Sequence, residues 1–114
     1  MGKNRDKLSI IADVLTSVST GCGKTRIMFS ANLSFKLLEK YLEITLDAGL
    51  IRLDNSVYSL TEDGREFLVR YKDFHQRYSK LQGLLEDLGS EQEKLNKLLE
   101  KQTLVRSAKL SRRL

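Results

Sequence analysis

The sequence contains no proline, and its only cysteine is Cys22. A chain with one cysteine forms no intramolecular disulfide and no multi-cysteine metal cage, and nothing points to an oxidising compartment. We interpret Cys22 as a small residue in a tight turn. No apolar run approaches the roughly 20 residues that cross a bilayer, and the first residues, MGKNRDK, lack the apolar core of a signal peptide. We therefore expect a cytoplasmic protein.

The composition is that of a globular, mainly helical protein. Hydrophobic residues make up 40% and charged residues 31% of the 114 positions, while the lack of proline and the long apolar-periodic runs favour helix. This length suits one small domain, alone or with an extended element. The net charge of +5 fits a polyanionic partner without proving one.

The first half of the chain carries the signals of three short helices. Apolar residues recur at helical spacing over residues 7–18, and the glycines at 21 and 23 supply a helix end and a turn. A second helix is expected over about residues 24–31. Ser34 is a good N-cap for a third helix, which continues to about Ala48 and ends at Gly49.

A β-hairpin is expected after the third helix. Residues 50–53 and 57–60 are short β-prone runs, and they flank the turn-forming cluster Asp54-Asn55-Ser56. Thr61 can cap a fourth helix, with acidic residues in its first turn. Three helices followed by a hairpin predict a winged helix-turn-helix over residues 1–61.

The fourth helix carries a heptad pattern of apolar residues. Seven positions alternate in steps of four and three, which predicts a coiled-coil dimerisation helix over residues 62–106. The seam consists of Phe67, Tyr71, Phe74, Tyr78, Leu81, Leu85 and Leu88. Gly89-Ser90 leaves two alternatives open, one continuous helix or a break followed by a shorter helix. We interpret residues 107–114 as a basic tail, and we expect it to fray.

Gly23-Lys24-Thr25 matches the end of a nucleotide-binding P-loop, but the rest of that motif is missing. A P-loop would require a glycine at position 18, where this chain has Val18, and a buried strand where it has an amphipathic helix. We therefore interpret Lys24, Thr25 and Arg26 as the start of a helix that contacts a DNA phosphate. The alternative is a solvated helix start without a ligand.

The third helix is the candidate recognition helix. Its helical projection places Phe35, Leu37 and further apolar residues on a wide buried arc, and leaves a polar arc with lysines near the N-terminal end. This arc contains no arginine, so we expect phosphate-dominated, weakly sequence-selective DNA binding. The expected DNA contacts are Lys24, Thr25, Arg26, Asn32, Ser34, Lys36, Lys40 and Arg52. The alternative is a winged-helix module that binds another protein and no DNA, because the same arc also carries three acids.

Several segments resemble one known family. The runs KTRIMFSANLSF at 24–35 and YSLTEDG at 58–64, with the long heptad helix, resemble the small archaeal winged-helix DNA-binding proteins, described as nucleoid-associated proteins or predicted transcriptional regulators. The similarity covers about residues 5–88. It implies a homodimer joined by an antiparallel coiled coil of the C-terminal helices, with a DNA-binding head at each end. The continuation past Gly89 departs from the shorter members.

A dimer is also expected on physical grounds, because a heptad stripe on an isolated helix would expose a long apolar surface to water. The alternative is a monomer whose helix folds back. A continuous helix over residues 62–106 would be roughly 65 Å long, which favours bridging or bending of DNA over the reading of adjacent half-sites. His75, beside the seam, is the single histidine of the sequence, so no metal site is expected, and no cofactor or catalytic set is evident.

Overall fold

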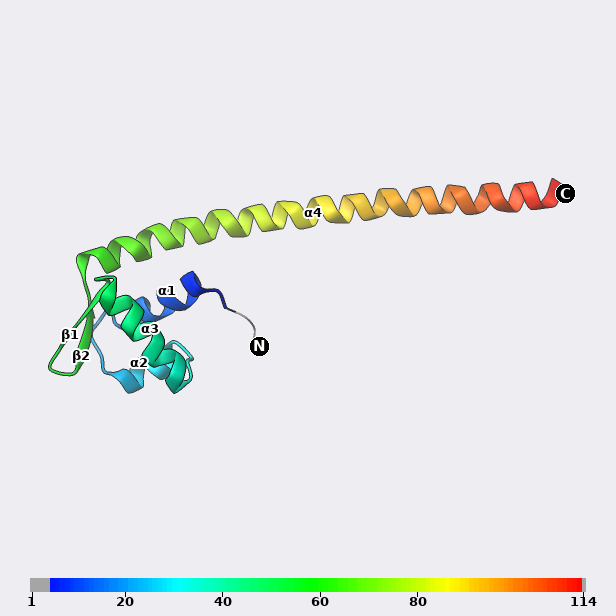
Figure 1. Cartoon of the computed structure of the whole chain (residues 1–114). Helices are drawn as coiled ribbons and strands as arrows, with labels where there is room; N and C mark the ends of the chain where they lie inside the picture. The colour runs from blue at the N-terminus through cyan, green and yellow to red at the C-terminus, as the bar shows by residue number, and fades with distance from the viewer. Residues whose placement is uncertain (1–4, 114) are drawn as a thin grey trace. The chain divides into compact units, whose positions relative to one another are not determined.

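The computed structural model describes residues 5–113, and the side chains of residues 5–101. The protein is mainly helical with one small hairpin, which confirms the predicted fold class (Figure 1). It divides into two compact units, Met1–Phe74 and His75–Leu114, and we call residues 5–74 the head. The elements are α1 (Lys7–Ser17), α2 (Lys24–Ser30), α3 (Phe35–Asp47), β1 (Ile51–Asp54), β2 (Val57–Leu60) and α4 (Glu62–Arg113).

The core of the head lies between α1, α2, α3 and the hairpin. Helix α1 begins after Asp6, whose carboxylate accepts a hydrogen bond from the backbone N–H of Ser9 at 2.7 Å. Each large aliphatic side chain buried here contributes about 1.5–3 kcal/mol to folding. The largest fully buried side chains are those of Val14, Leu15, Val18, Ile27, Leu38 and Thr45. The apolar spacing in the sequence therefore identified most of the inner faces of α1 and α3, but Leu8, Phe35 and Leu37 are exposed.

Helices α2 and α3 end in the same way. After α2, Asn32 adopts φ 54°, and the N–H of Leu33 donates to the carbonyl of Met28 at 3.0 Å. After α3, Gly49 adopts φ 75°, and the N–H of Leu50 donates to the carbonyl of Thr45 at 3.0 Å. This is the Schellman arrangement, which requires a left-handed residue and favours glycine or asparagine there.

The hairpin has a tighter turn than the sequence suggested. Asp54 belongs to β1 and pairs with Val57, so only Asn55 and Ser56 form the turn, at φ 49° and 67°. Two central residues with positive φ are the signature of a type I′ turn, whose twist matches the flanking strands. We had predicted a turn of three residues, Asp54-Asn55-Ser56, and the observed turn is one residue shorter.

Cys22 extends the hairpin with a backbone contact that the sequence did not predict. Its N–H donates to the carbonyl of Tyr58 at 3.1 Å, and the N–H of Tyr58 donates back at 2.8 Å. The thiol of Cys22 is buried and lies 3.1 Å from the carbonyl oxygen of Ser17. The turn before α2 is thereby attached to β2.

We expect the thiol of Cys22 to react slowly in the folded protein. Burial raises its pKa above the usual value, although the nearby charge of Arg26 opposes this shift. A raised pKa leaves less thiolate at pH 8, and burial also restricts access of a reagent. Alkylation by iodoacetamide, followed by mass spectrometry, should be at least about tenfold slower without urea than in urea. Equal rates under the two conditions would contradict the buried position.

Helix α4 begins at a well-defined cap and is continuous. The hydroxyl of Thr61 donates to the carbonyl of Gly49 at 2.6 Å and accepts from the N–H of Gly64 at 3.0 Å. Residues 89 and 90 are helical, so of our two alternatives the structure has the uninterrupted helix. It extends beyond residue 106, where we expected it to end, to Arg113. The first unit ends at Phe74 and so includes turns of α4 that we assigned to the dimerisation helix; the domain limits stay a prediction.

Candidate nucleic-acid interface

All eight residues predicted to contact DNA are exposed. They come from α2, from the turn that follows it, from α3 and from β1. Lys36 and Lys40 lie one turn apart on α3, on the side opposite the buried Tyr41 and Thr45. Arg52 lies on β1, where it pairs with Ser59 in the hairpin register. The prediction therefore selected surface residues.

Lys24 has an acidic partner that the sequence did not reveal. Its ammonium lies 2.6 Å from the Glu39 carboxylate on α3, and both side chains are nearly half exposed. The hydrogen bond to Glu39 raises the pKa of Lys24 above its usual value. An exposed pair of this kind adds little to stability. The pair connects the start of α2 to α3.

Phe35 does not lie on the buried side of α3, where we had predicted it. We expected its ring to be buried, but its exposed fraction is 64%. Leu37 is also exposed, whereas Leu38 and Leu42 are buried as expected. Phe35 is the first residue of α3, and a projection of the helix cannot tell whether the core extends as far as its first turn. The Lys24 ammonium lies 6.0 Å from the centre of the Phe35 ring, so three side chains meet here: Lys24, Phe35 and Glu39.

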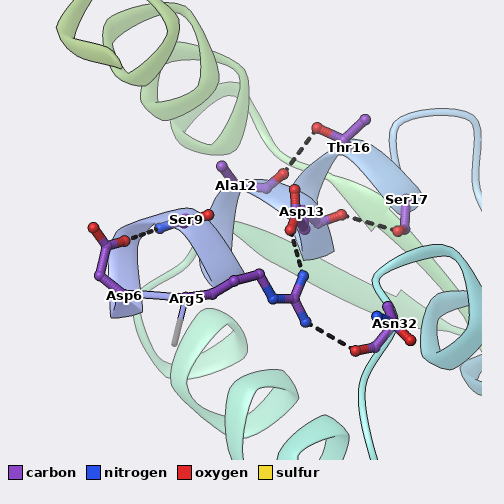
Figure 2. A network of polar contacts seen from close by, with 8 residues as sticks. All are labelled: Arg5, Asp6, Ser9, Ala12, Asp13, Thr16, Ser17 and Asn32. Atoms are coloured by element: carbon purple, nitrogen blue, oxygen red, sulfur yellow. Dashed lines mark hydrogen bonds and ion pairs between the residues drawn. The ribbon is translucent and has the colours of Figure 1, made fainter. Parts of the chain in front are cut away.

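Arg5 contacts the turn that precedes α3 (Figure 2). Its guanidinium is 2.6 Å from the Asp13 carboxylate and donates to the backbone carbonyl of Asn32 at 2.8 Å. Asn32 therefore has a structural reason to be present, since asparagine tolerates the left-handed conformation of this turn. Sequence reasoning missed Arg5, because its two partners belong to different elements and no local pattern connects them.

The acidic residues of α3 lie toward the hairpin. A cavity of about 400 Å³ is lined by α3 and by Tyr58 of β2. Its charged lining residues are Lys24, Glu39, Lys40, Glu43 and Asp47. Three carboxylates against two ammonium groups make this cavity a poor position for a phosphate. The N-terminal half of α3, where Lys36 lies, is the more favourable side for a polyanion.

The predicted dimerisation seam is half buried near the head and exposed farther along α4. Phe67 packs partly against the head core, and Tyr71 is half-buried. The following seam residues have exposed fractions between 50% and 66%. These residues are Phe74, Tyr78, Leu81, Leu85 and Leu88. The apolar stripe that the sequence predicted is therefore at the surface of a single chain.

The described part of the chain contains neither a helix that could span a membrane nor a metal-binding cluster. Within residues 5–113, no helix combines the length and the hydropathy that a membrane-spanning segment requires. In the same region, no three or more histidine, cysteine, aspartate or glutamate side chains are grouped so that they could hold a metal ion.

Comparison with known proteins identifies a family and a similar fold. The family described as winged helix-turn-helix matches residues 4–79. Two proteins of Methanocaldococcus jannaschii, both described as uncharacterized, are 37% identical over 70 residues and 32% identical over 63 residues. These matches span 60% and 54% of this chain, but only 33% and 65% of the relatives' own lengths.

A solved structure has the same fold. It is the crystal structure of Sso10a-2, described as a DNA-binding protein from Sulfolobus solfataricus, with a TM-score of 0.69 at 24% sequence identity. The similarity covers 75% of this chain and 95% of that one. At this level of identity, the comparison establishes the fold.

Proposed function

Because the chain belongs to the winged helix-turn-helix family, we propose that its head binds double-stranded DNA with the N-terminal half of α3 in the major groove. The observation that carries this proposal is the exposed pair Lys36 and Lys40 on the outer face of α3, the helix that reads DNA in helix-turn-helix proteins. The similar fold of Sso10a-2, described as a DNA-binding protein, supports the same function.

Phosphate contacts dominate the proposed binding. The outer face of α3 offers lysines and no arginine, and lysine acts on phosphate mainly as a point charge. Arg26 and Arg52 are exposed on neighbouring elements and add positive charge. Thr25, Asn32 and Ser34 are further exposed polar groups at the same helices. This set favours weak sequence selectivity, since phosphate contacts carry no sequence information directly.

The proposed active form is a homodimer joined through the seam of α4. Leu81, Leu85 and Leu88 are more than half exposed in the single chain, and a second copy of the same helix would cover them. We propose antiparallel pairing, and a role as a nucleoid-associated protein or transcriptional regulator in the cytoplasm. The proposal includes no catalytic step.

Lys36→Gln should lower both the affinity for DNA and its salt dependence. If the head makes about four phosphate contacts, log K should fall with log salt with a slope near 3.6 per head, and one lost contact should reduce this slope by about 0.9. Fluorescence anisotropy with a labelled duplex at several salt concentrations measures the slope. The matched control is Lys80→Gln on α4, which makes the same charge change outside the family match and should leave the slope unchanged.

The same titrations distinguish the alternative functions. Absence of binding to any duplex at low salt would contradict the proposal and favour a winged-helix module that binds another protein, which the three acids of α3 would suit. Equal affinity for specific genomic and random duplexes would favour an architectural role. A large ratio between them would favour control of particular genes.

A further inference from the structure

The exposed aromatic ring at the start of the recognition helix needs an explanation. The Phe35 side chain is 64% exposed, although a phenylalanine ring gains about 1.5–3 kcal/mol from complete burial. Ser34, immediately before it, caps α3 by accepting a hydrogen bond from the N–H of Leu37 at 3.2 Å. The backbone of Phe35 therefore belongs to the first turn of a capped, regular helix.

Two charged groups lie around this ring. The Lys24 ammonium is 6.0 Å from the ring centre, within the range of a cation–π interaction, and is also 2.6 Å from the carboxylate of Glu39. Glu39 follows Phe35 by one helical turn, so both side chains lie on the same edge of α3. Because Lys24 contacts both, its charge offsets the repulsion that Glu39 would exert on a nearby phosphate. An apolar ring is thus exposed at the N-terminal end of α3, beside a carboxylate whose charge is offset by Lys24 and outside the lining of the acidic cavity.

The major groove of DNA presents an apolar group that an exposed aromatic ring can contact. The apolar feature that base edges present in the major groove is the C5-methyl group of thymine, and phenylalanine is among the side chains that contact it. The N-terminal residues of a recognition helix are those that reach base edges. Lys36 and Lys40, exposed farther around α3, supply the charge complementarity that would bring this end of the helix to the groove.

From this geometry we propose that Phe35 is the specificity-determining residue of the head, and that its ring packs against the C5-methyl group of thymine in the major groove. This inference rests on the proposed DNA binding. It adds a modest preference for thymine-containing sites to an interaction dominated by phosphates. The preference is modest because one buried methyl group corresponds to about a fourfold change in affinity.

Replacement of thymidine by deoxyuridine tests this contact, because it removes the C5-methyl group of the base and nothing else. We would measure the affinity of the full chain for two A·T-rich duplexes of the same sequence, one with thymine and one with deoxyuridine. The wild type should bind the deoxyuridine duplex about fourfold more weakly for each contacted thymine. Phe35→Ala should bind the two duplexes equally. Circular dichroism would establish that the variant is folded, as expected for a substitution at an exposed position.

Phe29→Ala provides the matched control. Phe29 is an even more exposed phenylalanine, at 73%, but it lies on α2 and does not belong to the recognition helix. This variant should keep the wild-type preference for thymine. A second measurement restores the methyl group in another context: the wild type should prefer a G·C duplex that contains 5-methylcytosine over the unmethylated duplex, and Phe35→Ala should not.

The outcomes separate this inference from the proposed function. If the wild type binds both A·T-rich duplexes with equal affinity, the thymine contact is wrong while DNA binding stands. If Phe35→Ala keeps the preference, or Phe29→Ala loses it, Phe35 does not determine it. If the wild type binds neither duplex at low salt, the proposed function fails and the inference with it.

Discussion

Leu81→Glu is expected to convert the proposed dimer into single chains of 13.1 kDa. Leu81 occupies a d position of the heptad seam and is 55% exposed in the single chain. A two-fold dimer would contain the substitution twice, and each copy would lose the burial of a leucine, worth about 2 kcal/mol. A total of about 4 kcal/mol corresponds to a ~1,000-fold weaker dimer, before the cost of placing a carboxylate in the seam.

Sedimentation equilibrium at micromolar concentration measures this change as a fall from twice the chain mass to one chain mass. The matched control is Val69→Glu, because Val69 is also on α4 and is 68% exposed, but occupies the f position opposite the seam. This control should remain a dimer. A wild type with the mass of one chain would contradict the dimer itself, and would favour a helix that folds back.

The position of the seam also predicts a change in DNA binding. If two heads act on the same DNA molecule, loss of the dimer removes the gain in affinity that comes from linking two binding sites. Leu81→Glu should then bind a long duplex more weakly, while its affinity for a duplex that fits only one head should stay close to that of the wild type. Equal losses on the two duplexes would indicate damage to the head instead.

Gly64→Ala is expected to destabilise the head by about 3 kcal/mol, the upper part of the usual range for overpacking. Gly64 lies in the first turn of α4, and a Cβ atom there would overlap the carbonyl oxygen of Leu50 and approach Cδ1 of Leu60 to 2.7 Å. The Leu50 carbonyl cannot easily move away, because it accepts a hydrogen bond from the N–H of Thr61 at 3.1 Å. The close approach of two backbone segments therefore requires glycine at position 64.

Thermal unfolding followed by circular dichroism, at one fixed protein concentration, should show a melting temperature lower by roughly 12 °C or more. Gly83→Ala provides the opposite control on the same helix. A Cβ atom at Gly83 would contact nothing within 4 Å, so the helix should gain about 0.5–1 kcal/mol from the alanine. A Gly64→Ala protein that melts within about 2 °C of the wild type would contradict the packing described here.

Most of the secondary structure could be predicted because its signals are local. Ser34 and Thr61 were recognised as helix caps, and each accepts a hydrogen bond from an N–H three residues later. Gly49 was recognised as a helix end, and it adopts the positive φ that such an end requires. The sequence did not decide whether the fourth helix continues through residues 89 and 90, because glycine and serine weaken a helix without excluding it. The structure has the helix uninterrupted there.

The candidate DNA interface could be predicted only in part. The sequence selected residues that are all exposed, because charged and polar residues on the outer side of an amphipathic helix remain in water. It did not reveal that Lys24 has a partner, or that the Phe35 ring is outside the core. Both facts depend on how closely α2 approaches the first turn of α3, which helical periodicity does not encode.

The sequence by itself determined the order of the elements, most of the buried residues of α1 and α3, the winged helix-turn-helix class and the heptad stripe on α4. Each follows from periodicity, caps and turn residues that lie within a few positions of one another. Tertiary structure alone decided the Lys24–Glu39 pair, the exposure of Phe35, the link between Cys22 and Tyr58, and the attachment of Arg5 to the turn at Asn32. These contacts join residues far apart in the chain, and they form only when packing of the core has brought their elements together.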